Sequence, residues 1–316
     1  MRANLVAALL ISATLVCMGE VVEEEWLAWK EKHGKVYSSV QEETRAHALW
    51  LRNMDFIQSH NSRSDVSFTL EMNEFGDQES TAEPHQPQSS PLRYAPEVNN
   101  NFLPRAPPAS FDWTKRGVVS PVRNQGMIGK SDAFAVTEDL ESLHAINTGQ
   151  LVPLSVAEVV GCCSSPQGML EPDIYECISR HGGLCSEQSY PPSSRTAACM
   201  NASCQAVAND AKVTAHIPKG DETRMLTAVL ERPLVVYIDA SESSFQFYQA
   251  GVYEDSRCGH TLDHALQLVG YGQDAQGKPY WILKNSWGAS WGNKGYIWLR
   301  RGVNMCGVAD NAFYPQ

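Results

Sequence analysis

The stretch NQGMIGKSDAF, Asn124–Phe134, combines residue types that could support nucleophilic chemistry. It joins a tight Asn-Gln-Gly turn to the start of a helix, and Ser131 lies at that start. A serine hydroxyl attacks a substrate only when a neutral histidine takes its proton. Asp132 follows directly, and its charge would favour a protonated histidine, which accepts no proton. The pair Ser131-Asp132 therefore opposes catalysis.

The same pair has a structural interpretation. A serine can cap an unpaired N–H at a helix start, and an aspartate complements the positive end of the helix. The segment SDAFAVTEDLESLHAINTGQ has a core face and stops at Gly149, which predicts one helix. We expect Ser131 and Asp132 to stabilise its first turn.

Helical and β-rich segments occupy different parts of the chain. Residues 24–61 carry apolar and amide side chains at helical spacing, SFTLEMNEFGD predicts a strand, and residues 78–110 have the composition of a linker. From about residue 205, short apolar runs such as LVVYIDA, ALQLVGYG and PYWILKNSWG lie between turn residues and predict β-strands. The order favours an α+β fold with two subdomains and a cleft between them.

Composition and charge exclude some partners. The chain has 316 residues, of which 43% are hydrophobic, so most of its length can form a globular core. Its formal net charge of −11 argues against nucleic acid as a partner, because phosphates need basic side chains. The first 102 residues hold 15 of the 36 acidic side chains and 8 of the 25 basic ones, which sets them apart as a module.

Residues 1–19, MRANLVAALLISATLVCMG, have the pattern of a secretory signal peptide. Arg2 is followed by an apolar run to Val16, with small residues at Cys17 and Gly19 before the expected cleavage point. No later segment reaches the ~18 apolar residues that a membrane span needs. We therefore expect a protein without a membrane span that is secreted to the extracellular space or delivered to the lysosome.

Removal of Cys17 leaves an even number of cysteines, all beyond residue 160. In an oxidising compartment they predict disulfides rather than metal ligands, so we expect no metal and no cofactor. The eight are Cys162, Cys163, Cys177, Cys185, Cys199, Cys204, Cys258 and Cys306. One N-glycosylation sequon begins at Asn201.

Three segments in order, VRNQGMIGKSDAF, LDHALQLVGYG and PYWILKNSWGASWGNKGYIWL, resemble the active-site segments of papain-like cysteine proteases, most closely the cathepsin L type. Upstream, WLAWKEKHGKVY and MNEFGD resemble the inhibitory propeptide of that family, as do four spaced helical residues. PASFDWTKRGVVSPV resembles the start of the mature domain. The four helical residues are Glu42, Asn53, Ile57 and Asn61.

The resemblance implies a papain-like two-subdomain α+β fold, with a helical N-terminal half and a β-barrel-like C-terminal half around a cleft. It also implies a division into a signal peptide (1–19), a helical inhibitory propeptide (20–80), a linker or processing region (81–102) and a papain-like domain (103–316). The propeptide is then a partner of the domain that follows it.

The resemblance also implies roles for single residues. His264 matches the catalytic histidine, and Asn285 matches the asparagine that orients its ring. Trp287 matches the indole that shields their hydrogen bond. Gln125 matches the side-chain donor of the oxyanion hole.

Ser131 occupies the position of the nucleophilic cysteine, and Asp132 that of the neighbouring tryptophan. A cysteine at a helix N-terminus beside imidazolium ionises readily, whereas a serine hydroxyl does not. The resemblance therefore places a weaker nucleophile at the centre of the site.

By the same resemblance, Cys162 pairs with Cys199 and Cys258 with Cys306. Three pairings stay open for the other four cysteines, Cys163, Cys177, Cys185 and Cys204. The third disulfide of the family is missing, because Ile128 and Pro166 occupy its positions. Met169 falls where the family has a glycine that lets substrate approach, which indicates a remodelled binding cleft.

We expect a pseudoprotease that binds peptides, protease inhibitors or extracellular proteins in this cleft. The testin-like and nephritis-antigen-like members, which also carry serine at this position, are similar. One alternative is an active site of Ser131, His264 and Asn285 that hydrolyses, or catalyses condensation as the similar silicateins are thought to do. Lys130, Asp132 and the missing disulfide stand against a silicatein. A third hypothesis makes the propeptide an inhibitor of related proteases in trans.

Overall fold

The computed structural model describes residues 21–79, 107–164, 173–190, 199 and 204–316. The chain divides into two compact units, one of Met1–Arg63 with Met72–Glu79 and one of Ser64–Glu71 with Ser80–Gln316. The predicted signal peptide and the predicted linker lie outside the described residues, as do Pro166, Met169 and Asn201.

The first unit is helical. Residues 21–32 form one helix and α2 (Val40–Asn61) forms a second. Helix α2 begins at Ser39, whose side chain accepts a hydrogen bond from the N–H of Glu42 at 3.2 Å. The Glu42 carboxylate in turn accepts from the N–H of Ser38 at 2.7 Å, so the first turn is capped from both directions.

Tryptophans form the core of this unit. Trp26, Trp29 and Trp50 are buried, with the rings of Trp26 and Trp29 stacked at 5.3 Å between centroids. Trp50, Asn53 and Ile57 are the buried face of α2, as their three- and four-residue spacing predicts. Residues three or four positions apart lie on the same side of a helix, so the apolar and amide side chains of α2 face the same core.

The MNEFGD segment is a turn held against these helices within the first unit. The amide of Asn53 donates to the carbonyl of Gly76 at 2.8 Å, and the indole of Trp29 donates to the carbonyl of Asn73 at 2.9 Å. The expected strand over SFTLEMNEFGD is thus confined to β1 (Phe68–Leu70), because the residues after it turn back to satisfy the polar groups of the helices.

The second unit is built around a sheet whose strands run in the order β1-β5-β8-β7-β6-β4-β9-β3, with β2 paired to β6. The pairing of β5 with β8 is parallel and the other pairings are antiparallel. The strands after β1 are β2 (Phe111–Asp112), β3 (Thr214–Ile217), β4 (Leu234–Ile238), β5 (Tyr248–Tyr253), β6 (His264–Gln273), β7 (Pro279–Lys284), β8 (Tyr296–Arg300) and β9 (Ala312–Pro315).

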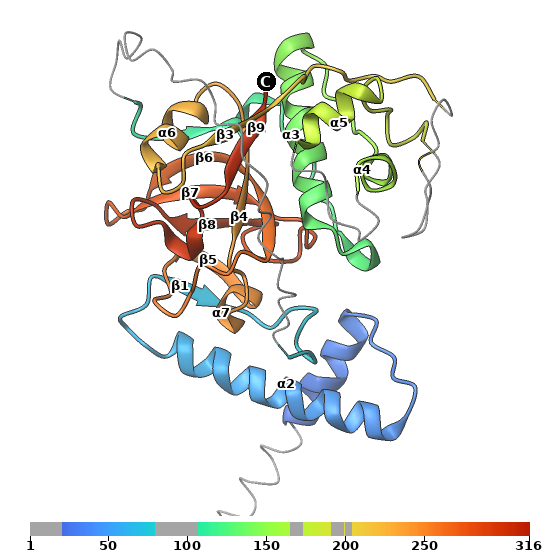
Figure 1. Ribbon diagram of the computed structural model, residues 1–316. Helices are drawn as coiled ribbons and strands as arrows, with labels where there is room; N and C mark the ends of the chain where they lie inside the picture. The colour runs from blue at the N-terminus through green and yellow to red at the C-terminus, as the bar shows by residue number, and fades with distance from the viewer. Residues whose placement is uncertain (1–20, 80–106, 165–172, 191–198, 200–203) are drawn as a thin grey trace, which may run out of the picture. The chain divides into compact units, whose positions relative to one another are not determined.

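Helices gather beside this sheet (Figure 1), where α3 packs against β6, β4 and β9. The α-helices of the second unit are α3 (Ser131–Thr148), α4 (Val156–Cys162), α5 (Ile174–Arg180), α6 (Glu222–Ala228) and α7 (Ser243–Gln246). Short 3-10 turns are η2 (Trp113–Arg116), η3 (Gly126–Ile128) and η4 (Met305–Gly307). The expected α+β architecture, with a helical part followed by a β-rich part, is confirmed.

Helix α3 is buried from its first residue to Ala145 and ends at Gly149, as predicted. Gly149 has φ +76°, a left-handed conformation that glycine adopts without strain. The expected cap at the other end is wrong. Lys130 occupies the cap position and Ser131 is the first helical residue, so the serine hydroxyl does not cap the helix.

The cysteines that the structure describes form four disulfides, and these include the two pairs that the resemblance implies. These pairs are Cys162–Cys199 and Cys258–Cys306. The remaining four cysteines form Cys163–Cys177 and Cys185–Cys204, which is one of the three pairings left open. Within the described residues, no helix has the length and apolar character to cross a membrane.

Candidate active site

Strand pairing brings the histidine and the asparagine together. His264 is the first residue of β6, and Asn285 directly follows β7, the antiparallel neighbour of β6. Their side chains meet with 2.7 Å between His264 Nε2 and Asn285 Oδ1. His264 is 5% exposed and Asn285 is fully buried, so this contact lies away from water.

A second hydrogen bond defines the direction of the first. Asn285 Oδ1 also accepts from the backbone N–H of Ser286 at 2.7 Å. A backbone N–H can only donate, so the atom it faces is the amide oxygen, and His264 Nε2 must then be the N–H donor. In the neutral ring this leaves Nδ1 as the nitrogen able to accept a proton.

Aromatic rings cover the pair. The ring of Trp287 lies 4.8 Å from that of His264, and Phe245 packs edge-on against both at 6.2 Å and 5.6 Å. Trp287 therefore lies where a shielding indole is expected. Excluding water from a hydrogen bond strengthens it, because the local dielectric falls.

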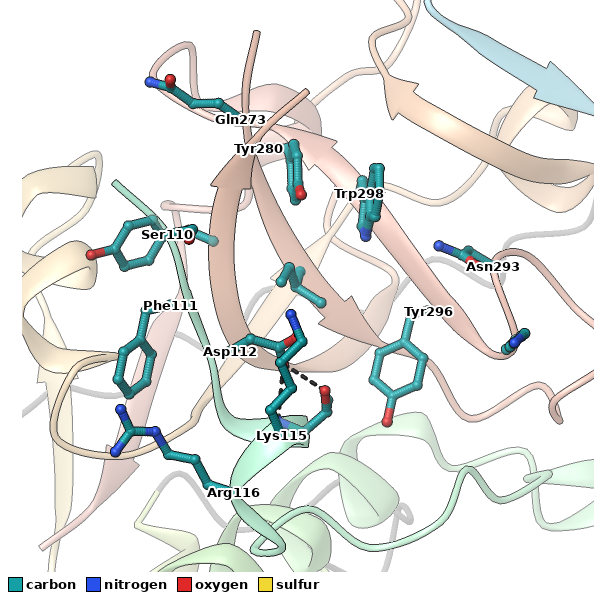
Figure 2. A pocket seen from close by; sticks show the side chains of 14 residues that line it. Ser110, Phe111, Asp112, Lys115, Arg116, Gln273, Tyr280, Asn293, Tyr296 and Trp298 are labelled. Carbon is teal, nitrogen blue, oxygen red and sulfur yellow. Dashed lines mark hydrogen bonds and ion pairs between the residues drawn. The ribbon is translucent and has the colours of Figure 1, made fainter. Parts of the chain in front are cut away.

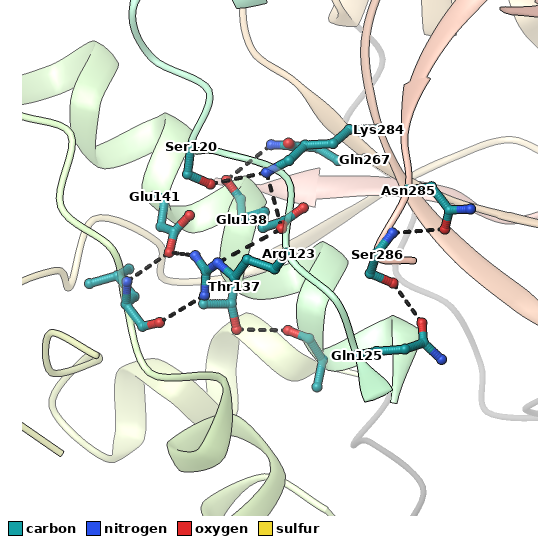
Figure 3. A network of polar contacts seen from close by, with 12 residues as sticks. Ser120, Arg123, Gln125, Thr137, Glu138, Glu141, Gln267, Lys284, Asn285 and Ser286 are labelled. Atoms are coloured by element: carbon teal, nitrogen blue, oxygen red, sulfur yellow. Dashed lines mark hydrogen bonds and ion pairs between the residues drawn. The ribbon is translucent and has the colours of Figure 1, made fainter. Parts of the chain in front are cut away.

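The turn of Gln125 is held by Ser286, which sequence reasoning missed. The N–H of Gln125 donates to the carbonyl of Ser286 at 2.7 Å, and the Ser286 hydroxyl donates to Gln125 Oε1 at 2.6 Å (Figure 3). With Oε1 occupied, the amide NH₂ of Gln125 is left to donate to an acceptor. One serine thus orders both Gln125 and Asn285.

Ser131 joins the group through the backbone. Its hydroxyl is 3% exposed and accepts a hydrogen bond from the N–H of Ala265, the residue after His264, at 3.1 Å. Asp132 is 4% exposed, and its carboxylate accepts from the N–H of Ala133 at 2.8 Å. The acidic side chain therefore lies in the first turn of α3, as predicted, and the serine binds the strand instead of its own helix.

Comparisons with known proteins follow the same order of segments. The model of the papain family of cysteine proteases matches residues 107–316, and that of the cathepsin propeptide inhibitor domain matches residues 26–81. The chain belongs to the papain family of cysteine proteases. The boundaries after residue 80, between propeptide and linker, and after residue 102, between linker and papain-like domain, stay predictions.

Relatives match this papain-family chain over nearly its whole length. Procathepsin L of Mus musculus is 35% identical over 97% of this chain and 98% of its own, and mouse cathepsin K is 35% identical over 94% of each. Among solved structures, a recombinant stem bromelain precursor has a TM-score of 0.84 at 33% identity, covering 93% of this chain and 98% of its own. Digestive procathepsin L 3 of Tenebrio molitor has a TM-score of 0.81 at 32% identity with the same coverage.

Carboxyl groups shape the electrostatics of the papain-family site. Burial raises the pKa of Asp263, which precedes His264, to about 6, and the neighbouring Asp239 adds to the rise. Burial and then the charge of Asp132 raise the pKa of Tyr237, which faces Ala265 across the sheet.

Cysteine and histidine side chains gather near α4 and α5 in groups that have the residue types of metal ligands. Ligand atoms of Cys162, Cys199 and His181 lie within 4.8 Å of one another, and Cys163 and Cys177 lie similarly close to His181. All four sulfurs are bonded in disulfides, so these groups offer a metal no thiolate.

A separate pocket lies on the sheet (Figure 2), and neither Ser131 nor His264 lines it. The rings of Tyr280 and Trp298 stack there at 4.4 Å, and Lys115 pairs with Asp112 at 3.3 Å on the facing segment. On β8 the lining residues Tyr296 and Trp298 lie two positions apart, the spacing that puts side chains on one face of a strand.

Proposed function

We propose that this chain is a cathepsin L-like pseudoprotease that binds peptides, protease inhibitors or extracellular proteins without cysteine-protease turnover. The observation that carries the proposal is the state of Ser131. Its Oγ accepts a hydrogen bond from the N–H of Ala265 at 3.1 Å, which anchors the side chain to β6 at the residue after His264.

Two physical effects support loss of turnover. A serine hydroxyl is a weaker nucleophile than a thiolate, and here one lone pair of its oxygen already accepts a hydrogen bond from the N–H of Ala265. Asp132, one residue along the helix, adds a buried acidic group next to the position of the nucleophile. By contrast, the order around His264, Asn285 and Gln125 is kept, which suits a binding site.

Turnover of fluorogenic dipeptide amides and esters tests the proposal. The unaltered chain would be assayed before and after an added protease has cleaved the 81–102 region, beside His264→Ala and Ser131→Cys variants. We expect no turnover by the unaltered chain and a gain in Ser131→Cys. Turnover by the unaltered chain that vanishes in His264→Ala would overturn the proposal in favour of a hydrolase or condensing enzyme using Ser131, His264 and Asn285.

Binding needs its own measurement. Calorimetric titration of the cleaved chain with a protein inhibitor of papain-like proteases should give a saturable signal. Trp287→Ala should weaken it by disordering the covered histidine, whereas Ser189→Ala, an exposed change, should not. Absence of binding to this inhibitor and to a peptide panel would count against the proposed role.

A second candidate function belongs to the first unit. It has a buried tryptophan cluster of its own, around Trp26, Trp29 and Trp50, and the propeptide model matches 26–81. We propose as an alternative that this unit inhibits related proteases in trans. Residues 20–102 alone should then slow cathepsin L, and a Trp50→Ala version should not.

The proposed site of action is the extracellular space or the lysosome. The signal-peptide pattern of residues 1–19 and the four disulfides support a secretory route. Immunodetection in the medium and in lysosomal fractions of expressing cells would test it, with a 1–19 deletion as the control.

A further inference from the structure

Glu138 lies about two turns into α3 from Ser131 and is 1% exposed. A single carboxylate in this position makes contact with two cations. Its Oε1 lies 3.0 Å from Lys284 Nζ and 4.0 Å from Arg123 Nε (Figure 3). Its backbone carbonyl accepts a hydrogen bond from the side chain of Gln267 at 3.0 Å. Three segments of the chain therefore converge on one residue of α3.

Each of those segments carries a residue of the candidate site. Lys284 directly precedes Asn285, and Arg123 lies two residues before Gln125. Gln267 lies three residues after His264 on β6. Ser131 begins the helix to which Glu138 belongs. Glu138 lies on one of the four segments that assemble the site, and it contacts two others through its carboxylate and the fourth through its backbone carbonyl.

Lys284 depends on Glu138 for a counter-charge more than Arg123 does. Arg123 has other partners, an ion pair and hydrogen bond with Glu141 and a hydrogen bond to the carbonyl of Leu154 at 3.2 Å. The side chain of Lys284 is fully buried, and its ammonium group donates to Ser120 Oγ at 3.0 Å. Among the described residues, Glu138 is its one carboxylate partner.

A buried ammonium without a counter-charge is strongly disfavoured, so it moves toward water or loses its proton. Either response in Lys284 would shift the end of β7 and with it the side chain of Asn285. Asn285 holds His264 through a 2.7 Å contact, so the imidazole would lose its fixed orientation.

We propose that Glu138 is a positioning residue, which holds Lys284 and through it Asn285 and His264 in place around Ser131. The inference deepens the proposed function, since it names what keeps that site assembled in the absence of a cysteine nucleophile. Glu138 itself touches no reacting atom.

The test uses the full chain carrying Ser131→Cys, in which the introduced thiol reports on the imidazole beside it. Thiolate absorbance near ~240 nm is titrated with pH, and every other cysteine of the described residues is in a disulfide. An ordered imidazolium and the helix start should place the midpoint well below the usual ~8.5. Adding Glu138→Gln should raise that midpoint by about one pH unit or more.

Asp139→Asn is the matched control. Asp139 is the next residue of α3, equally buried, and bonded to Tyr175 at 3.2 Å. Burial raises its pKa well above the usual range, and its replacement leaves the contact between Glu138 and Lys284 in place. The midpoint should then move by less than about 0.3 pH units, even if the melting temperature changes.

If Glu138 has only a structural role, Glu138→Gln will lower the melting temperature and leave the midpoint of the thiol titration unchanged. That result would overturn the proposal. A Ser131→Cys parent with an ordinary midpoint overturns it too, because no assembled site then exists. If Glu138→Gln does not fold, Glu138→Gln with Lys284→Met also removes the unpaired ammonium, so this pair should keep a parent-like midpoint, and a raised midpoint in it overturns the proposal. Turnover by the unaltered chain would end the pseudoprotease proposal and leave this titration unaffected.

Discussion

The backbone N–H of Ala265 donates to Ser131 Oγ at 3.1 Å, which ties the first residue of α3 to the second residue of β6. His264, one step before Ala265, is bound to Asn285 at 2.7 Å. The hydroxyl of Ser131 is therefore a structural link between helix and sheet. The histidine beside it is held independently.

Replacing Ser131 with alanine should destabilise the protein. The N–H of Ala265 would remain buried without its acceptor, and an unsatisfied buried group costs about 1–3 kcal/mol in the free energy of unfolding. Urea unfolding followed by fluorescence measures this. The exposed change Ser189→Ala should stay within about 0.5 kcal/mol. Equal stability of Ser131→Ala and the parent would show that the link contributes nothing.

The pairing Cys163–Cys177 should be recovered by peptide mapping under non-reducing conditions, together with Cys185–Cys204. Changing both Cys163 and Cys177 to serine opens a loop with a sequence separation of 14. Loop-closure entropy predicts a loss of about 3 kcal/mol in the free energy of unfolding. A peptide joining Cys163 to Cys185 would contradict the pairing.

His216 should make the protein sensitive to acid. Both of its ring nitrogens are buried without a hydrogen-bond partner in the described residues, and burial lowers its pKa, opposed in part by Asp173. A lowered folded pKa means that its contribution is complete above the unfolded value of about 6.5 and is lost as pH falls below it.

His216→Phe should remove that part of the acid sensitivity. The slope of unfolding free energy against pH between about 6.5 and 5 should fall by up to about 1.4 kcal/mol per pH unit, the value for one proton. Denaturant midpoints at several pH values give the slope. The exposed change His260→Phe serves as a comparison, and equal slopes in parent and His216→Phe would rule out the assigned role.

Trp50 tests the core of the first unit. It is 3% exposed, and its indole nitrogen has no hydrogen-bond partner in the described part of the chain. Trp50→Ala should cost about 3–5 kcal/mol, because it leaves a large cavity. Trp50→Phe should cost less than about 1.5 kcal/mol, since it also removes a buried unpaired donor. Thermal unfolding of residues 20–102 would separate the two, and equal losses would contradict this account.

Local pattern was enough for much of the fold. The apolar spacing of α2 predicted its buried face of Trp50, Asn53 and Ile57, and Gly149 ended α3 as expected. The strand over SFTLEMNEFGD was predicted too long, because its second half satisfies buried polar groups of helices far away in the sequence. Alternation alone carries no information about such partners.

The sequence predicted which residues form the candidate site but not the hydrogen bonds and ion pairs that hold them together. His264, Asn285, Gln125 and Ser131 were identified from their motifs, whereas Ser286 and Glu138 were not. Ser286 acts through a backbone and a side-chain hydrogen bond to Gln125. Nothing in the local sequence distinguishes such a serine from an exposed one.

The sequence by itself determined the family and the α+β architecture, and it predicted a serine at the position of the nucleophile, because motifs and periodicity are local properties of the chain. Only the tertiary structure decided that Ser131 binds Ala265 and that Lys284 meets Glu138 in a dry interior. These contacts join residues more than a hundred positions apart. They form because burial leaves each polar group dependent on whichever partner the packing of helix and sheet brings within reach.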